Sequence, residues 1–445
     1  MVVREKDWNR TFYRIFCNAD ALSESKGWVY LMYYPLLKEV YSMNRHLLIN
    51  GDISSYDLDL VDAFYFNFNL YDRTLPVITL DQFRSILGET EFFIPSPLKK
   101  YACGYGEYTG NRLLVNYHDA SPCFSFCGQQ FQLESIFPPV AISEREKERI
   151  LVFILENLLD SGIVDPCFRQ VLRHILSDYV RLSTRMFLTV STWLFPLLRI
   201  YKGNVVTDQT LAPGQCCVNH LLKSSGNRIT VLQHQKNLIL SDLYPIVYLD
   251  FLLADEYVSW VSRDVLLYNY SDYRDTIPEI VLQKGEIRFR QEVVSRIADR
   301  IKNGKKCLFI LTSRERKHIT GTVLGSQDAG SNNKIVQLLL DLGYDVYVRR
   351  DPRDKSLTMN GNFIVDDSRS LQEAITKYDL CICDRPGGAT IEVLELLGFV
   401  FVPAKLEGFK HTPTYNDLVV KQHLIKKMLP TDKGRLFELF DLLFA

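Results

Sequence analysis

The residues with the clearest potential for chemistry lie in the stretch 381–403, which reads CICDRPGGATIEVLELLGFVFVP. Gly387 and Gly388 have no Cβ, so their backbone N–H groups can approach a ligand closely. They precede a helical pattern, and the start of a helix carries unpaired N–H donors and a partial positive charge. This combination predicts a diphosphate site. The alternative is a glycine pair that only turns the chain.

The same stretch contains two carboxylates that could bind a ribose. Glu392 and Glu395 lie one and two turns into the helix predicted for ATIEVLELLG, which Gly398 ends. The apolar run DLCIC before the glycine pair is typical of a buried parallel strand, and FVFVP after the helix predicts the next strand. The stretch is therefore expected to form one βαβ unit.

A second polar group follows the strand predicted for KKCLFILTS. It consists of Ser313, Arg314, Arg316 and Lys317. Cations and a hydroxyl just past the carboxyl end of a strand are suited to clamp the oxygens of a phosphate. The alternative is a solvated loop, which is the usual state of a run of charges.

A third group ends the strand predicted for RITVLQHQ. Ligands of open α/β sheets bind at the carboxyl ends of the strands, so Gln233, His234 and Gln235 are well placed. His234 is a candidate general base, because the pKa of a free histidine is close to neutral pH. The alternative is a histidine with a structural role. We assign Gln233, Gln235 and Asp208, from the preceding strand segment NVVTDQ, to the acceptor side of the site.

These groups require two series of alternating strands and helices. From residue 305 onward, strands alternate with helices such as NKIVQLLLDLGY and SLQEAITKY, which predicts a parallel, doubly wound sheet. NVVTDQ, RITVLQHQ and LADEYVSW are predicted strands of an earlier series. Residues 143–201 are predicted to be helical, with a Ser143 cap and a first stop at Gly162. The first 140 residues contain no glycine-rich phosphate loop.

Composition limits the classes of function. The chain has 445 residues, enough for two domains, and its 52 basic and 53 acidic side chains give no surplus for binding nucleic acid. The ten cysteines form no zinc pattern, so free thiols in a reducing compartment are expected. The N-terminal segment has no apolar signal core, and the most apolar stretch, 186–200, is too short to span a bilayer. We expect a cytoplasmic protein, with contact to the inner membrane surface left open.

The order of these segments resembles the GT-B glycosyltransferases. More narrowly, it resembles bacterial capsule and surface-carbohydrate transferases, a group that includes glycerophosphotransferases and polysialyltransferase-like enzymes. The segment that ends in RITVLQHQ is similar to a helix and strand that end in Gln-His-Gly in that group, and LADEYVSWVSRD is similar to its Asp-x-Tyr-x-x-Trp strand. VLQKGEIRF resembles the turn that opens the interdomain linker, and DLCICDRPGGATIEVLELLGFVFVP resembles the donor-binding unit. The resemblance covers roughly residues 205–430.

The resemblance implies two Rossmann-like, doubly wound domains that face a cleft, and no bound metal or other cofactor. It implies that His234 is a base or substrate contact. It further implies diphosphate contacts from two places, and we add Lys317 and Arg385 to the resulting set, which is Ser313, Arg314, Lys317, Arg385, Gly387, Gly388, Ala389 and Thr390. The ribose-binding acid of the group often lies where this chain has Val393, so Glu392 or Glu395 is expected to replace it.

The expected function is transfer of a sugar from a nucleotide sugar to a glycan or lipid-linked acceptor in surface polysaccharide synthesis. A non-catalytic glycan- or nucleotide-binding protein, a polyol-phosphate transferase and a sugar-nucleotide epimerase remain alternatives. The expected domains are an acceptor-side domain (1–285), a nucleotide-sugar domain (286–430) and a C-terminal helix (431–445) that could pack back on the first domain.

Overall fold

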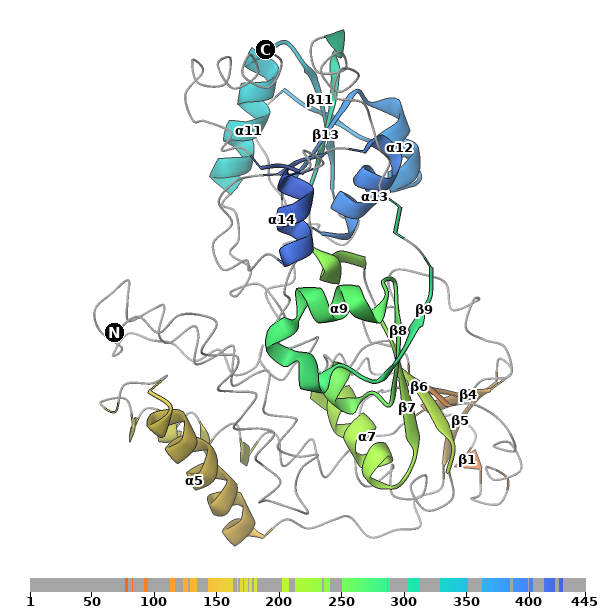
Figure 1. Cartoon of the computed structure of the whole chain (residues 1–445), viewed down its shortest axis with the longest axis vertical. Helices are drawn as coiled ribbons and strands as arrows, with labels where there is room; N and C mark the ends of the chain where they lie inside the picture. Colours follow the sequence, from red (N-terminus) through yellow and green to blue (C-terminus); the bar gives the residue numbers. More distant parts are fainter. Residues whose placement is uncertain are drawn as a thin grey trace. The chain divides into compact units, whose positions relative to one another are not determined.

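The computed structural model contains two β-sheets with helices around them (Figure 1). It describes residues 77–78, 82, 92–94, 113–116, 123–126, 129–133, 143–162, 166, 169–170, 172–174, 176–177, 180–181, 202–207, 213–233, 236–240, 250–285, 287–288, 303–311, 329–350, 362–384, 387–398, 400–402, 412–420 and 424–426.

The larger sheet joins nine of the described strands in the order β1-β5-β4-β3-β2-β6-β7-β8-β9. Their bounds are β1 (Val77–Ile78), β2 (Phe92–Ile94), β3 (Leu113–Asn116), β4 (Cys123–Phe126), β5 (Gln129–Leu133), β6 (Asn204–Thr207), β7 (Arg228–Leu232), β8 (Glu256–Ser259) and β9 (Ile280–Gln283). The β6–β7 and β7–β8 pairs are parallel, as the alternating pattern predicts. The β3–β4 and β4–β5 pairs are antiparallel, which the sequence analysis did not predict. Two residues separate β4 from β5, and so short a connection can join only antiparallel neighbours.

Two helices in the first half of the chain match predicted segments. α5 (Glu144–Asp160) begins where Ser143 Oγ accepts a hydrogen bond from the backbone N–H of Glu146 at 3.2 Å, which confirms the predicted cap. Gly162, just past its end, has a φ of 70°, a conformation that suits glycine. α7 (Pro213–Ser224) connects β6 to β7, as expected for a βαβ unit.

The smaller sheet joins six described strands in the order β12-β11-β10-β13-β14-β15, and its pairs are parallel. The strands are β10 (Lys306–Ile310), β11 (Asp345–Arg349), β12 (Ile364–Val365), β13 (Leu380–Cys383), β14 (Val400–Val402) and β15 (Leu424–Lys426). Numbered along the chain within this sheet, the order is 3-2-1-4-5-6, the order of a Rossmann sheet. The prediction of a parallel, doubly wound sheet in this half of the chain is confirmed.

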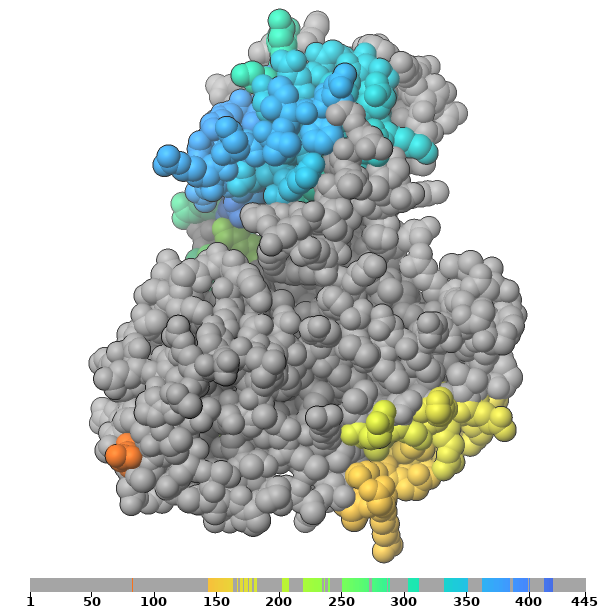
Figure 2. Space-filling model, turned by 180° about the vertical axis from the view of Figure 1, so that it is seen from behind, coloured from red at the N-terminus to blue at the C-terminus, as the bar shows by residue number. Residues whose placement is uncertain are grey.

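Helices cover both faces of the smaller sheet. They are α11 (Ala329–Asp341), α12 (Leu371–Lys377), α13 (Gly388–Leu397) and α14 (Pro413–Val420). Right-handed crossovers place α11 on one face and α12 and α13 on the other, as Figure 1 shows. The core is centred on β10 and β13, where Leu308, Phe309, Cys381 and Ile382 are at most 1% exposed. Figure 2, which views the molecule from behind, shows described residues of this part in cyan to blue at the top.

The chain divides into two compact units, each built from three segments that alternate along the sequence. One unit contains Met1–His234, Tyr244–Ser259 and Asp275–Leu282, and the other contains Gln235–Leu243, Trp260–Arg274 and Gln283–Ala445. The unit of the smaller sheet thus includes two segments that precede residue 285, the 3-10 helix η5 (Lys236–Ile239) and the helix α9 (Arg263–Asn269). Residues around the start of α14 hold both segments, because Thr414 Oγ1 donates to Asn269 Oδ1 at 2.7 Å and Thr412 N donates to Leu240 O at 3.3 Å.

Every helix in the described ranges is too short or too polar to cross a lipid bilayer.

Candidate functional site

The smaller sheet reverses its strand order between β10 and β13. These strands pair in parallel from Cys307 opposite Leu380 to Ile310 opposite Cys383, so both end at the same edge of the sheet. The chain leaves β10 for a helix on one face and leaves β13 for a helix on the other. Ligands of open α/β sheets bind in the crevice outside such a reversal. The two segments with the predicted phosphate-binding residues, one after β10 and one after β13, both begin at this edge.

The predicted βαβ unit is present, and its turn leaves room for a ligand. β13 leads into α13, which Gly398 ends with a φ of 81°, and β14 pairs in parallel with β13. Gly387 is the N-cap residue with extended backbone angles that any residue can adopt, so its conformation does not require glycine. A Cβ on Gly387 or Gly388 would meet no described atom within 4 Å. Packing among the described residues therefore does not explain the glycine pair, whereas close approach of a ligand would.

Thr390 stabilises this turn from inside. Its side chain is 0% exposed, and its Oγ1 accepts a hydrogen bond from the backbone N–H of Gly387 at 3.0 Å. A further hydrogen bond links Thr390 to the thiol of Cys383 at the end of β13. This placement gives Thr390 a role in shaping the start of α13. The phosphate-binding potential at this helix start lies in the backbone N–H groups of its first turn.

The two candidate ribose carboxylates are in different environments. Lys236 Nζ, from η5, donates to both carboxylate oxygens of Glu395 at 2.9 Å, and the two side chains are 28% and 22% exposed. Glu392 has no hydrogen-bond partner among the described residues. Its partial burial raises the pKa of its carboxyl, and the charge of Lys236 partly opposes this effect. Glu392 is thus the carboxylate of this pair that is available to a ligand.

Lys236 belongs to a cluster that the sequence analysis missed. Its Nζ lies 4.9 Å from the ring centroid of Trp260, and the Nζ of Lys284 lies 4.7 Å from the same centroid. A Cβ on Gly285 would approach a ring carbon of Trp260 to 3.2 Å, so this glycine permits close packing on the ring. Because 159 residues separate Lys236 from Glu395, no local pattern could indicate their contact.

The different environments of the two acids predict opposite effects on stability. We expect Glu392→Gln to raise the melting temperature at pH 7, because burial disfavours the ionised carboxyl. A carboxyl whose pKa is raised by folding reduces stability above the folded pKa, and this loss disappears below the unfolded pKa of about 4.3. The difference from the wild type should therefore shrink as the pH falls from 7 to about 4.

The matched control is Glu395→Gln, which breaks the ion pair with Lys236 and is expected to lower the melting temperature. Thermal melts of the three proteins between pH 4 and 7 test both expectations. A lower melting temperature for Glu392→Gln at pH 7 would show that Glu392 forms a stabilising contact and is not available to a ligand.

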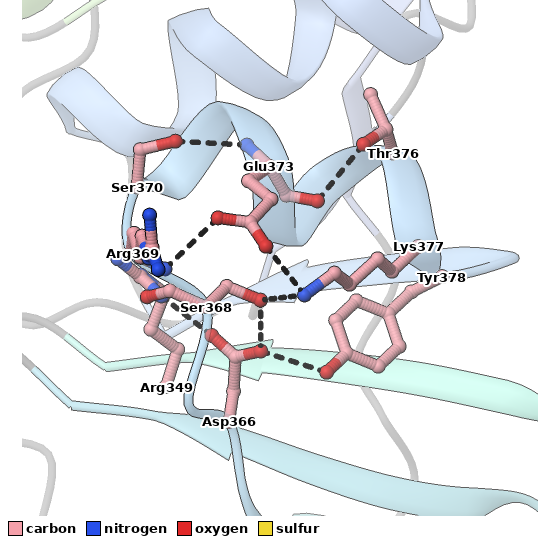
Figure 3. Close-up of polar contacts among 9 residues, drawn as sticks. All are labelled: Arg349, Asp366, Ser368, Arg369, Ser370, Glu373, Thr376, Lys377 and Tyr378. Carbon is pink, nitrogen blue, oxygen red and sulfur yellow. Dashed lines mark hydrogen bonds and ion pairs between the residues drawn. The ribbon is translucent and has the colours of Figure 1, made fainter.

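A polar network holds the neighbouring part of the same sheet edge (Figure 3). Asp366, directly after β12, accepts hydrogen bonds from Arg349 Nη1 at 2.5 Å, Ser368 Oγ at 2.7 Å and Tyr378 OH at 2.7 Å. The side chain of Asp366 is 0% exposed and that of Arg349 is 17% exposed. Burial opposes ionisation of Asp366, but these three hydrogen bonds hold its pKa below the usual range. The network fixes the carboxyl ends of β11 and β12 beside the candidate site.

The remaining predicted site residues are located as follows. Gln233, assigned to the acceptor side, is 1% exposed at the end of β7, and its Oε1 accepts a hydrogen bond from Ser259 Oγ at 2.6 Å. This position suits a role in joining the ends of β7 and β8. The others lie outside the described residues, and their assignments stay predictions: Asp208, His234, Gln235, Ser313, Arg314, Lys317 and Arg385.

No cluster of three or more His, Cys, Asp or Glu side chains within the described ranges is placed to hold a metal ion. Cys307, Cys381 and Cys383 are free and buried. Burial raises the pKa of the Cys383 thiol to about 12, so this thiol is protonated at neutral pH and unsuited to act as a nucleophile.

Searches with the sequence found no matching protein-family model and no matching curated protein.

Proposed function

We propose that the protein is a metal-independent glycosyltransferase of the GT-B type, which transfers a sugar from a nucleotide sugar to a glycan or lipid-linked acceptor. The observation that carries the proposal is the reversal of strand order between β10 and β13, next to a helix that begins at a glycine pair. Sheets of this order bind nucleotides at this place. The proposal includes a second Rossmann-like domain that supplies the acceptor side of a cleft.

The donor would bind with its diphosphate at the first turn of α13. The backbone N–H groups of Gly387, Gly388 and Ala389 would donate to phosphoryl oxygens, and the positive end of the helix would favour their charge. Arg314, Lys317 and Arg385 would add positive charge, and Ser313 a hydroxyl. Glu392 would accept hydrogen bonds from the ribose, since Glu395 already binds Lys236.

The reaction would be a displacement at the anomeric carbon of the donor sugar. His234 would accept the proton of an acceptor hydroxyl as its oxygen bonds to the anomeric carbon. The bond from that carbon to the diphosphate oxygen would break, and the diphosphate would leave with the electron pair. The N–H groups at the start of α13 and the nearby cations would stabilise the charge that develops on it.

Replacement of His234 tests this mechanism and separates it from a non-catalytic binding function. We expect His234→Ala to lower the rate of nucleotide release from the bound nucleotide sugar by about 100-fold or more, with donor affinity within about threefold of wild type. The measurement is a coupled assay of free nucleotide together with calorimetric titration of the donor.

The control is His220→Ala, which removes a histidine on α7 that lies 3.3 Å from Ser224 Oγ and has no proposed catalytic role. Equal rates for His234→Ala and wild type would exclude His234 as the base. Binding of a nucleotide sugar without any turnover in the wild type would favour the non-catalytic alternative.

A further inference from the structure

The start of α11 contains a buried amide without a hydrogen-bond partner. The side chain of Asn332 is 0% exposed, and both its Nδ2 and its Oδ1 lack a partner among the described residues. Burying such a group without hydrogen bonds costs about 1–3 kcal/mol, and native structures contain few examples. At the edge of a sheet where ligands bind, an amide of this kind is a candidate ligand contact.

The position of Asn332 in the fold indicates where that group would bind. Ile335, Val336 and Leu339 are buried and follow Asn332 at intervals of three, four and seven residues, so all four lie on the face of α11 that packs against the sheet. α11 follows β10 and runs antiparallel to it, so its first turn lies at the carboxyl edge of the sheet. Asn332 therefore lies near the carboxyl edge of the sheet, on the side of β10 and β11.

Two helices begin at this edge. α11, with 13 residues, begins there from one face of the sheet, and α13 begins there from the other. In sheets of this order the first strand-to-helix turn binds a diphosphate. The unpaired amide of Asn332 adds a side-chain donor and acceptor to the unpaired backbone N–H groups of the α11 start.

We propose that Asn332 binds the donor at the junction of its diphosphate and its sugar, an inference that rests on the proposed function. Asn332 Nδ2 donates to a phosphoryl oxygen, and Oδ1 accepts a hydrogen bond from a hydroxyl of the transferred sugar. A phosphoryl oxygen and a neighbouring sugar hydroxyl would together satisfy both atoms, and the ribose hydroxyls are assigned to Glu392. Because Asn332 is fully buried in the free chain, the ligand enters through local opening of the first turn of α11, and helix ends open at low cost.

Replacement by leucine tests the role of this amide, because leucine has a similar size and no polar atoms. Asn332→Leu should leave the free protein at least as stable as the wild type, since an unsatisfied amide is removed. It should weaken binding of the nucleotide sugar by about tenfold or more, and binding of the matching nucleotide alone by less than about threefold. Asn332→Asp, which replaces the N–H donor with a negative charge, should weaken binding of both ligands.

The matched control is Asn219→Leu. Asn219, in the middle of α7, is also 0% exposed with both polar side-chain atoms unpaired in the described structure. Asn219→Leu should change stability by about as much as Asn332→Leu does, but it should leave the affinity for both ligands unchanged. The wild type is first tested with UDP, GDP, CDP, CMP and ADP to identify the nucleotide that it binds. Calorimetric titration of the full chain then measures the affinity of each variant for that nucleotide and for the corresponding nucleotide sugar.

The outcomes separate the two proposals. If the wild type binds the nucleotide sugar and Asn332→Leu binds it with the same affinity, the role of Asn332 is overturned and the proposed function is not. Equal losses in Asn332→Leu and Asn219→Leu would also overturn it, because a general effect on stability would then explain them. Absence of any nucleotide-sugar binding in the wild type would overturn the proposed function and this inference together.

Discussion

Replacing Asp366 with asparagine is expected to lower the free energy of unfolding by about 2–4 kcal/mol, the largest effect on stability anticipated for this chain. Asparagine retains the shape of aspartate, and its Oδ1 can still accept hydrogen bonds from Ser368 and Tyr378. It removes the negative charge opposite Arg349, whose side chain is 17% exposed. The cost thus arises from leaving a largely buried guanidinium without its counter-charge.

Urea denaturation of full-length variants, followed by circular dichroism, measures this effect. Tyr378→Phe removes a single hydrogen bond to Asp366 and should cost about 1 kcal/mol. Glu373→Gln breaks the exposed ion pair with Lys377 and should change little. The double variant Asp366→Asn with Arg349→Met should recover part of the loss, because neither charge then remains unpaired. Wild-type stability in Asp366→Asn would contradict the account of this network.

The same network predicts a dependence on pH. The folded pKa of Asp366 is depressed, so its contribution to stability is present above the unfolded value of about 3.9 and is lost as the pH falls through the folded pKa. The stability difference between wild type and Asp366→Asn should therefore be constant between about pH 5 and 7 and should shrink below about pH 4.

Replacing Gly388 with valine is expected to weaken nucleotide binding by about 100-fold or more while leaving stability within about 1 kcal/mol of wild type. A Cβ on Gly388 meets no described atom within 4 Å, so a β-carbon at this position causes no clash with the described residues of the free protein. A ligand whose phosphate contacts the backbone at the start of α13 would collide with it. The expected effect is therefore specific to binding.

Gly343→Ala is the control, because it should lower stability and leave nucleotide binding unchanged. Gly343 joins α11 to β11 at the opposite edge of the sheet and has a φ of 86°, so alanine there is strained and should reduce stability by about 1 kcal/mol. Its affinity for nucleotide should equal that of the wild type. Calorimetric titration and thermal melts of both variants separate the two effects, and unchanged nucleotide affinity in Gly388→Val would place the ligand elsewhere.

Elements with strong local patterns could be predicted from the sequence. β13, α13 and β14 match the predicted βαβ unit, because the strand residues are uniformly apolar and Gly398 fixes the helix end. The Ser143 cap of α5 is equally local, since the cap and its partner Glu146 are three residues apart. In both cases the signal is contained within a single element.

Contacts between distant segments could not be predicted in this way. The ion pair between Lys236 and Glu395 and the attachment of α9 to residues at the start of α14 depend on how the chain returns to the smaller sheet. The antiparallel β4–β5 pair is local, since two residues join its strands, but the sequence analysis assigned no strand to either segment.

Asn332 illustrates how a boundary decides an interpretation. The predicted helix NKIVQLLLDLGY begins at Asn333, so Asn332 was expected in the polar loop before it. In such a loop, water can form hydrogen bonds with the amide. In the structure α11 begins at Ala329, so Asn332 lies on the apolar face with Ile335, Val336 and Leu339. The helix start thus differs by four residues from the predicted one, and Asn332 is buried on the helix where a solvated loop residue was predicted.

The most direct test of the central claim is a thermal-shift series of the full-length protein with UDP, GDP, CDP, CMP and ADP, each with and without a divalent cation. A nucleotide at a hundredfold excess over its dissociation constant stabilises the folded state by about 2.7 kcal/mol. We predict that one of these nucleotides raises the melting temperature without need of the cation. An unchanged melting temperature with all five would contradict a nucleotide site at the reversal of strand order.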